Sequence, residues 1–304
     1  MAEPQLPGDA RRILKGRRLR FTSSQNSLRG GDPRRFPAYE GARLLAALFL
    51  DGIYYPQNHL SHLSQKLAAV VKEAGGDVIT SCGAEEVLVQ GEGTRGKPIG
   101  IRLADGSQVR SNVVVLDVDP RGALTGLIQP SFLGLEFLKE MGKLRPSGSA
   151  FVLHLIFQED LRIPERVFLF PPKARKVRTG DTYLEVDSII LSKEACTEAG
   201  KMGCVLLARI HVPNHCYHVF EDPAQSEEMG AELTSLIKEE VASILPAVKN
   251  AVKEFVTLPS HFTRLTSNGQ GAAFGFAPML DQWYYRRPGP RLPLPNLYLV
   301  GAWS

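Results

Sequence analysis

One hexapeptide of this 304-residue chain has the spacing of a cofactor-binding loop. Gly91-Glu92-Gly93-Thr94-Arg95-Gly96 matches G-x-G-x-x-G. That loop binds the pyrophosphate of a dinucleotide only when a strand enters it and a helix leaves it. Pro98 and a strand pattern at residues 99–103 follow here, so a helix cannot begin at that point. The motif is therefore predicted to be a hairpin loop, and the chain has no second match.

A second group of residues could bind a metal ion. His211, His215, Cys216 and His218 lie within eight positions of one another, and zinc needs three or four converging nitrogen or sulfur ligands. In a strand, His211 and His215 would share one face and the other two would share the opposite face. Two hypotheses stay open, a metal site and a strand end exposed to solvent, and the second is favoured. We therefore predict no metal.

Other chemistry-bearing residues give weaker indications. His59 and His62 lie at the start of a predicted helix without a carboxylate at a suitable offset, and no G-x-S-x-G nucleophile loop exists. The aromatic run at residues 283–285 would either pack in a core or form the wall of an apolar pocket. We assign no catalytic residue from these patterns.

The elements that must position such residues are read from hydrophobic periodicity. A short helix is predicted at residues 39–50, a second helix follows residue 58 and ends at Gly75-Gly76, and a third covers residues 226–245. Asp105-Gly106 predicts a hairpin turn. Strands are predicted at residues 77–80, 85–90, 97–103, 108–116, 149–157, 183–191, 204–212 and 297–300.

Composition and charge exclude several classes of protein. The chain is 43% hydrophobic and 22% charged, with a net charge of +4, which is typical of a globular protein. Nine Lys/Arg face three acids within residues 1–35, so the rest of the chain is close to neutral and nucleic-acid binding is not expected. Four cysteines without a C-x-x-C pair exclude a disulfide framework. No apolar run reaches the ~20 residues that span a bilayer.

Residues 1–35 are predicted to form a basic, flexible tail. Pro, Gly, Ser and Arg dominate there, and no secretory signal is indicated. Two other hypotheses are a contact with anionic lipid and an organelle transit segment, although Glu3 and Asp9 argue against the second. The expected location is cytoplasmic, with peripheral membrane contact and organelle targeting both left open.

Several stretches, taken in order, resemble the phytoene desaturase and carotenoid isomerase branch of the FAD-dependent, amine-oxidase-like flavoproteins. The resemblance covers residues 36–304, and it depends on the order and spacing of the motifs. They are Gly52-Ile53-Tyr54-Tyr55-Pro56, Gly75-Gly76-Asp77-Val78, Leu116-Asp117-Val118-Asp119-Pro120, Lys143-Leu144-Arg145-Pro146-Ser147, Gly271-Ala272-Ala273-Phe274-Gly275, Gln282, Arg287-Pro288 and Pro295-Asn296-Leu297-Tyr298-Leu299-Val300-Gly301-Ala302.

The resemblance implies an α/β fold in which a partial FAD-binding (glutathione-reductase-like) domain carries an inserted α+β substrate domain. The implied domains are residues 36–125 for FAD binding, 126–270 for the substrate and 271–304 for the return to the FAD domain. Carried over residue by residue, the backbone of Ala84 would lie beside the adenine. Gly301 and Ala302 would lie along the ribityl chain and pyrophosphate, and Gly271 would lie near the isoalloxazine or the substrate tunnel.

The chain departs from the family pattern at several points. Asn58-His59 replaces the glycine pair after Tyr-Pro, and Gln270-Gly271 replaces a second pair. The N-terminal strand, G-x-G-x-x-G loop and helix are missing, and the chain ends at Ser304, before the last FAD-binding helix of the family. The resemblance therefore implies a truncated form of such an enzyme.

The implied function is an FAD-dependent oxidoreductase, of desaturase, isomerase or saturase type, that acts on an apolar isoprenoid or carotenoid-like substrate. Its expected cofactor is FAD and its expected partner is this small molecule, whereas peripheral membrane contact is left open. The alternative is a non-catalytic lipid-binding or interaction module derived from such an enzyme. Oligomeric state is left open.

Overall fold

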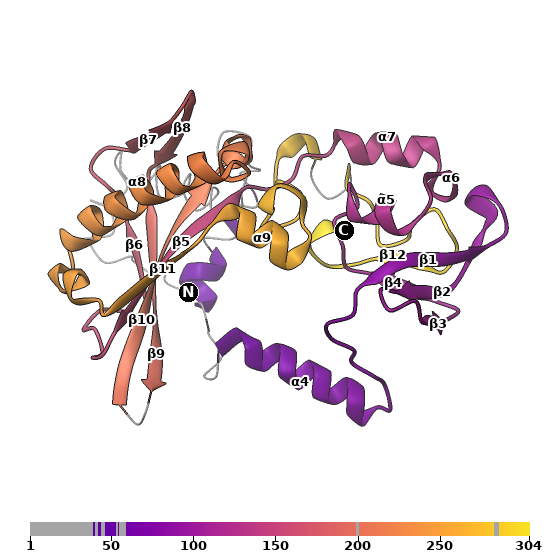
Figure 1. Ribbon diagram of the computed structural model, residues 1–304, viewed down its shortest axis with the longest axis horizontal. Helices are drawn as coiled ribbons and strands as arrows, with labels where there is room; N and C mark the ends of the chain where they lie inside the picture. Colours follow the sequence, from indigo (N-terminus) through magenta and orange to yellow (C-terminus); the bar gives the residue numbers. More distant parts are fainter. Residues whose placement is uncertain are drawn as a thin grey trace, which may run out of the picture. The chain divides into compact units, whose positions relative to one another are not determined.

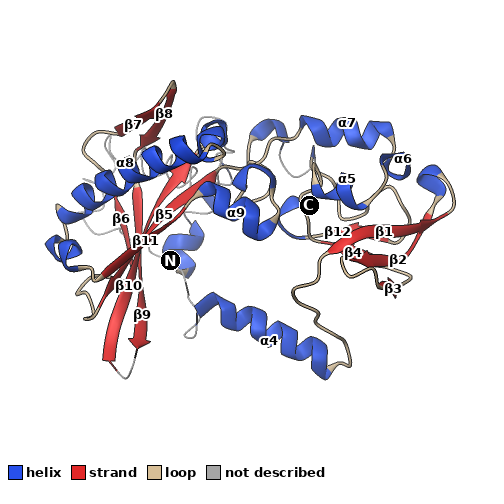
Figure 2. Cartoon of the chain, viewed as in Figure 1, coloured by secondary structure: helices blue, strands red, loops and turns tan. Residues whose placement is uncertain are grey.

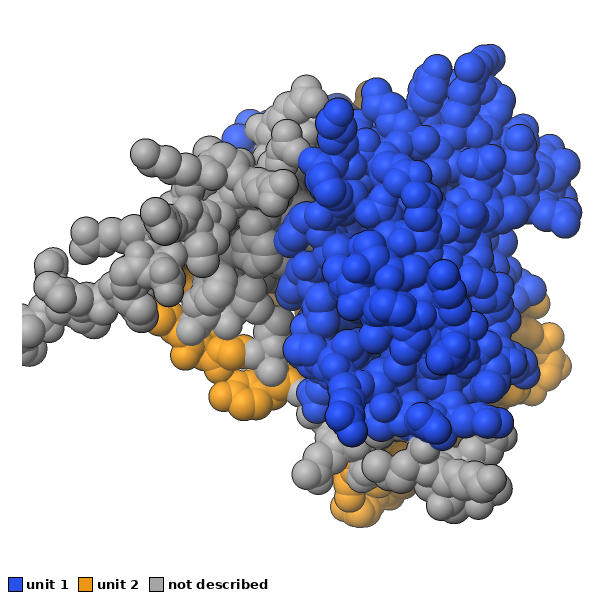
Figure 3. Space-filling view, turned by 90° about the vertical axis from the view of Figure 1, so that its left-hand side faces the viewer, with its two compact units in different colours: residues 1–36, 142–287, 301–303 blue, residues 37–141, 288–300, 304 orange. Residues whose placement is uncertain are grey.

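The computed structural model describes residues 39, 42–43, 46–52, 54, 59–198, 201–282 and 286–304. The chain forms two compact units (Figure 3). Unit 1 contains residues 1–36, 142–287 and 301–303, and unit 2 contains residues 37–141, 288–300 and 304. The basic tail, most of the helix predicted at residues 39–50 and the aromatic run at residues 283–285 lie outside the described residues. The domain bounds implied by the resemblance stay a prediction.

Unit 1 is a twisted antiparallel sheet with one long helix packed on it (Figures 1 and 2). The strand order is β11-β5-β10-β9-β6, and α8 lies across one face. The strands are β5 Ser149–Phe157, β6 Arg166–Leu169, β9 Ile189–Glu198, β10 Lys201–Val212 and β11 Lys253–Thr257, and a separate hairpin joins β7 Arg175–Thr179 to β8 Thr182–Val186. The helices are η4 Asn214–Phe220, α8 Pro223–Ala242, η5 Pro246–Asn250, α9 Pro259–Thr266, η6 Gly269–Gly271, η7 Leu280–Gln282 and η9 Gly301–Trp303.

The core of unit 1 follows from two periodicities. Alternate residues of β5 and β10 are fully buried against α8, because successive side chains of a strand point to opposite faces. Leu153 and Ala208 face each other across the two strands. On α8, Met229, Leu233 and Ile237 recur at helical spacing and are also buried. The sheet face toward α8 is therefore the core of this unit.

The start of α8 differs from the prediction. The helix covers Pro223–Ala242, where the apolar pattern predicts residues 226–245. Asp222 caps its first turn by accepting a hydrogen bond from the Gln225 N–H at 2.9 Å, and Pro223 occupies the first helical position. Both are strong helix-start signals that the apolar pattern does not contain. The predicted end at Leu245 lies about one turn beyond the observed end at Ala242.

Unit 2 contains small sheets and short helices. Its strands are β1 Ala84–Gln90, β2 Lys97–Leu103, β3 Gln108–Arg110, β4 Val114–Leu116 and β12 Leu297–Leu299. Its helices are η2 Ala47–Asp51, α4 His59–Glu73, η3 Gly93–Arg95, α5 Ala123–Leu127, α6 Pro130–Leu133 and α7 Leu135–Lys143. β1, β2 and β3 form an antiparallel sheet, and β12 pairs with β4 in parallel. Asp105-Gly106 forms the predicted turn, with Gly106 at φ +83°.

Three strand predictions were wrong in part. The run 108–116 splits into β3 and β4 of different sheets, because the Ser111 hydroxyl bonds the carbonyl of Val113 and bends the chain. The run 183–191 splits into β8 and β9 at Asp187-Ser188. Residues 77–80 pair with no strand among the described residues, and an extended segment without a partner is not a strand.

Helix α4 ends as predicted but exposes its apolar side. Gly75 at φ +82° and a bond from Gly76 N–H to the Val71 carbonyl at 2.9 Å end the helix. Leu60, Leu63 and Leu67 are all more than half exposed.

In the part of the chain that the structure describes, no helix has the length and apolar character needed to cross a membrane.

Candidate functional site

The parallel pair of unit 2 creates the edge at which α/β proteins bind cofactors. β4 pairs with β12 from Val114↔Leu297 to Leu116↔Leu299, although the two strands lie far apart in the sequence. The Val300 N–H then bonds the Leu116 carbonyl at 2.8 Å, which extends the pairing to the carboxyl ends. In open α/β sheets, ligands bind outside these ends. This edge of unit 2 is therefore the candidate cofactor edge.

The loop that follows β4 is held by a buried carboxylate. Asp119 is 1% exposed. It accepts from the Arg121 backbone N–H at 3.0 Å and from its guanidinium at 3.0 and 2.6 Å. Because Arg121 is half-buried and binds through two nitrogens, this pair fixes the loop more firmly than a surface ion pair would. Asp119 therefore has a structural role, because it fixes the conformation of the loop at the candidate cofactor edge.

The structure places the four predicted cofactor-contacting residues in different settings. Gly301 follows β12, lies at φ +83° and is exposed, as is Ala302. Ala84 is the exposed first residue of β1. Gly301, Ala302 and Gly271 belong to unit 1, whereas Ala84 belongs to unit 2. Their common approach to one ligand stays a prediction.

Gly271 has a packing reason to be glycine. It lies at φ +61°, and a Cβ there would stand 2.6 Å from the Pro259 carbonyl oxygen, 2.9 Å from Ser149 Oγ and 3.1 Å from Tyr217 Cε2. Protein atoms thus fill the space that a side chain would need. Its N–H donates to Thr263 Oγ1 at 2.8 Å. This glycine does not form an open cradle, so its flavin contact stays a prediction without structural support.

The segment after Gly271 packs against the last residues of the chain. A Cβ on Gly275, which lies at φ +69°, would collide with the Ala302 carbonyl, so the two backbones are in direct contact. Trp303 is 2% exposed and meets Phe276 edge-on, with ring centroids 5.0 Å apart. Ser147 joins this cluster, because its N–H donates to the Gly275 carbonyl at 2.8 Å.

Gln282 and Arg287 cross-link the same region. The side-chain amide of Gln282 donates to the carbonyls of Arg145 and Ala277 at 2.8 and 2.7 Å. The Arg287 guanidinium donates to the carbonyls of Phe276 at 3.1 Å and Gln282 at 3.2 Å. These two residues belong to the motif that supports the family resemblance. These hydrogen bonds hold the backbone in place.

The G-x-G-x-x-G match is a hairpin loop, as predicted. β1 enters it, the single turn η3 follows, and β2 leaves antiparallel to β1. A Cβ on Gly96 would stand 2.6 Å from a methyl carbon of Val89. The glycines therefore serve a tight turn, and the loop has no helix N-terminus to hold a phosphate.

The His/Cys group does not converge. No group of three His, Cys, Asp or Glu side chains in the described residues could hold a metal ion. His218 bonds Thr182 Oγ1 and the His215 carbonyl, each at 2.9 Å. Burial raises the pKa of the Cys216 thiol to about 11. The favoured alternative, a solvent-exposed strand end, was also wrong for Cys216, which is fully buried.

Sequence reasoning missed the sheet face of unit 1 that faces away from α8. On β10 this face carries Leu207, Arg209 and His211, and on β5 it carries Val152 and His154, all half-buried. Burial, followed by the charge of Arg209, lowers the pKa of His211 to about 4. Burial also lowers the pKa of His154, whose ring stacks on Phe255 with centroids 4.2 Å apart. The alternation in β10 could have indicated this mixed face.

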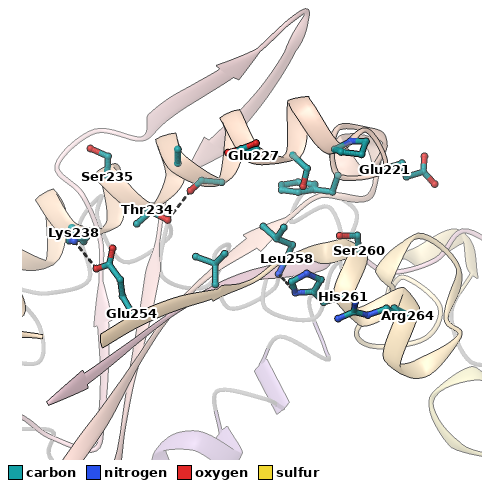
Figure 4. A pocket seen from close by; sticks show the side chains of 16 residues that line it. Glu221, Glu227, Thr234, Ser235, Lys238, Glu254, Leu258, Ser260, His261 and Arg264 are labelled. Carbon is teal, nitrogen blue, oxygen red and sulfur yellow. Dashed lines mark hydrogen bonds and ion pairs between the residues drawn. The ribbon is translucent and has the colours of Figure 1, made fainter. Parts of the chain in front are cut away.

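A groove of about 1050 Å³ lies between α8 and the β11–α9 segment of unit 1 (Figure 4). Gly230 and Thr234 line its helix wall, and Val256 and Leu258 line its strand wall. The Lys238–Glu254 ion pair, at 2.7 Å, spans the two walls. β11 is the edge strand of its sheet. The groove is therefore open, partly apolar and rimmed by charge.

Comparison with known proteins shows the family of the chain. The family described as flavin containing amine oxidoreductase matches residues 21–304. Among curated proteins, the chain is 24% identical over 271 residues to a 4,4'-diapophytoene desaturase of a Methylomonas species, covering 83% of this chain and 50% of that protein. It is also 24% identical to a neurosporene-forming phytoene desaturase of Rhodobacter capsulatus, covering 99% of this chain and 59% of the relative. The chain thus spans about half the length of the curated relatives it matches.

Two solved structures share the fold. A crystal structure of an oxidoreductase from Methanosarcina mazei superimposes with a TM-score of 0.59 at 15% identity, covering 97% of this chain and 62% of that one. Cyclohexylamine oxidase from Brevibacterium oxydans gives a TM-score of 0.54 at 13% identity, covering 95% of this chain and 59% of the other. At these identities the likeness concerns the fold alone.

Proposed function

Because the chain belongs to the flavin-containing amine oxidoreductase family, we propose that it acts in an FAD-dependent oxidoreductase reaction on an apolar, isoprenoid or carotenoid-like substrate. The proposed reaction is the desaturation, isomerisation or saturation of a polyene. The names of similar proteins support this substrate class, since they include desaturases of diapophytoene, phytoene and hydroxyneurosporene.

The observation that carries the proposal is the parallel pairing of β4 with β12. It brings the return strand beside a strand from the first half of the chain, with both carboxyl ends at one edge. The residue after this pair is an exposed glycine with positive φ, Gly301. A cofactor can approach such a backbone closely, because no Cβ intervenes.

The residues fit part of the cofactor. Gly301 and Ala302 are small and exposed, so they would hold part of FAD through backbone contacts. When bound, FAD supplies the two-electron redox chemistry. The chain's own residues would bind the substrate and exclude water. The apolar members of the outer sheet face, such as Val152 and Leu207, would contact a long hydrocarbon. No side chain is assigned to move a proton.

Flavin binding by the purified chain tests this proposal. We expect flavin absorbance to co-purify or be acquired with FAD. Saturating FAD at about 100 times Kd should raise Tm by roughly 5 °C, because a ligand that binds the native state stabilises it. Adenosine diphosphate, which lacks the flavin, should give a smaller rise. Absence of any shift with FAD would contradict the proposal.

A second candidate function is a non-catalytic lipid-binding or interaction module. The groove between α8 and β11 favours it, because this groove is partly apolar and lies within unit 1 alone. Lipid binding that is insensitive to FAD, in a chain that gives no flavin shift, would support the module over the enzyme.

Peripheral membrane contact is proposed alongside the apolar substrate. The basic residues within the first 35 positions would attract an anionic surface. Co-sedimentation with vesicles containing 30% phosphatidylserine, compared with neutral vesicles, tests this contact. Equal binding to both would contradict it.

A further inference from the structure

Arg209 has an unusual environment on the outer face of the unit 1 sheet. The register places Val152 beside it on β5 and Ile190 beside it on β9. Leu207 and His211 flank it on its own strand and face. Among the residues that the structure describes, no carboxylate pairs with its guanidinium. A half-buried cation with apolar neighbours and no counter-ion is costly.

A second arginine faces the same region. Arg166 on β6 is paired with Ser192 of β9, two residues along the strands from the Phe168↔Ile190 pair. Strand spacing puts the two arginine Cα atoms roughly 12 Å apart, within reach of two long side chains. Burial, followed by the charge of Arg166, lowers the pKa of Arg209. Arg209 is half-buried and Arg166 is exposed at the start of β6, so an anion bound between the two would offset the charge repulsion and supply the counter-ion that Arg209 lacks among the described residues.

Glu194 is an acid on this face, and it lies away from Arg209. Glu194 is paired with Val205, which lies four residues from Arg209 along β10. Its charge raises the pKa of His154 and so opposes part of the lowering caused by burial. Between the arginines and His154 this face carries the half-buried Val152 and Leu207 and the buried Ile190, with Ser192 as a polar neighbour. The face therefore combines an anion-recognising end with a hydrocarbon-recognising floor.

We propose that Arg209, assisted by Arg166, recognises the carboxylate of an acid-bearing isoprenoid that lies along the outer face of the unit 1 sheet. A guanidinium donates two parallel hydrogen bonds to a carboxylate, which gives direction as well as attraction. The assignment of the hydrocarbon part of the ligand as an isoprenoid rests on the proposed function. The anion recognition rests on Arg209 and its surroundings. The proposed substrate is therefore an isoprenoid that carries a carboxylate, not an isoprenoid hydrocarbon without a charged group.

The experiment measures binding of all-trans retinoic acid and retinol to the full chain without FAD, by quenching of tryptophan fluorescence. These probes differ only in the head group. We expect the acid to bind at least tenfold more tightly than the alcohol. Arg209→Met should abolish this ratio by weakening the binding of retinoic acid. Arg209→Lys should keep part of it, since charge remains without the planar fork.

The control is Arg178→Met on the β7–β8 hairpin, where the arginine side chain is 60% exposed. It should retain the full ratio. Circular dichroism and Tm establish that each variant is folded. An equal affinity for acid and alcohol in the parent chain, or an undiminished ratio in folded Arg209→Met, would overturn the proposal. If Arg209→Met does not fold, Arg209→Lys decides, because an undiminished ratio there contradicts recognition by the fork.

Palmitic acid separates the two parts of the inference. Tighter binding of retinoic acid than of palmitic acid supports the isoprenoid chain that comes from the proposed function. Equal binding of the two acids overturns that chain assignment alone. The acid-to-alcohol ratio and its dependence on Arg209 still decide the anion site in that case.

Discussion

The side-chain amide of Gln282 forms two hydrogen bonds with the backbone of Arg145, accepting from its N–H at 3.0 Å and donating to its carbonyl at 2.8 Å. The same amide also bonds the Ala277 carbonyl. Gln282 is 2% exposed, so water cannot replace these partners. A residue that belongs to a family motif thus joins two segments of unit 1 distant in sequence.

Gln282→Leu should therefore destabilise the protein by about 2 kcal/mol, because it leaves backbone groups without partners. Urea unfolding measures this change in the free energy of unfolding. Gln158→Leu, at an exposed position directly after β5, is the control and should change it by less than about 0.5 kcal/mol. Similar values for the two variants would show that Gln282 has no such role.

Gly275→Ala should release the end of the chain from unit 1. The new methyl would meet the Ala302 carbonyl, and φ +69° is itself unfavourable for alanine, so a loss of about 1–3 kcal/mol is expected. In a Trp283→Phe background, emission of the buried Trp303 should shift to the red. Gly126→Ala, where nothing lies within 4 Å of the added Cβ, should leave the emission unchanged.

Acidification should destabilise unit 1 through His211. Its folded pKa is about 4, below the ordinary value of 6.5, so the unfolded chain binds the proton first as pH falls. Its contribution to stability is complete above pH 6.5 and is lost as pH falls toward 4. The facing groups are Arg209 and His215, with the Ser149 backbone as hydrogen-bond partner.

His211→Gln should flatten the fall in the free energy of unfolding between these two pH values. The lowered pKa of His154 would contribute a remainder of the same sign. A variant that keeps the full pH dependence of the parent would contradict the assignment to His211.

Thiol reactivity should differ between two cysteines. Burial raises the pKa of Cys216 to about 11, and its thiol donates to the Tyr183 carbonyl at 3.4 Å, whereas Cys82 is partly exposed. Because the thiolate is the reactive form, iodoacetamide at pH 8 should label Cys82 first in the native protein. Mass spectrometry identifies the labelled site. Equally fast labelling of Cys216 would contradict its burial.

Local patterns predicted the fold best where one signal decides a segment. The strand Ser149–Phe157 alternates clearly, and Asp105-Gly106 fixes a hairpin by turn chemistry. Prediction was wrong where side chains bond the backbone, as Ser111 does, or where a cap starts a helix early, as Asp222 does. Such bonds act within a few residues and leave the apolar period unchanged.

The candidate site was less predictable, because it depends on contacts across the sheet. The role of Gly271 in packing depends on Pro259 and Tyr217, which no local pattern links to it. The setting of Arg209 depends on Val152 and Ile190 from two neighbouring strands. The resemblance to flavoproteins identified the family, but only the register of the strands shows which side chains share a face.

The most direct test of the flavin assignment compares two glycine variants. Gly301 and Gly106 both lie at φ +83°, so Gly301→Val and Gly106→Val impose a similar backbone strain. Gly301 lies at the proposed cofactor edge, whereas Gly106 lies in the β2–β3 turn. We predict that FAD binds the parent chain and Gly106→Val with similar Kd, and that Gly301→Val weakens binding at least tenfold. Equal FAD affinity in the two variants, or no FAD binding by the parent chain, would contradict the account.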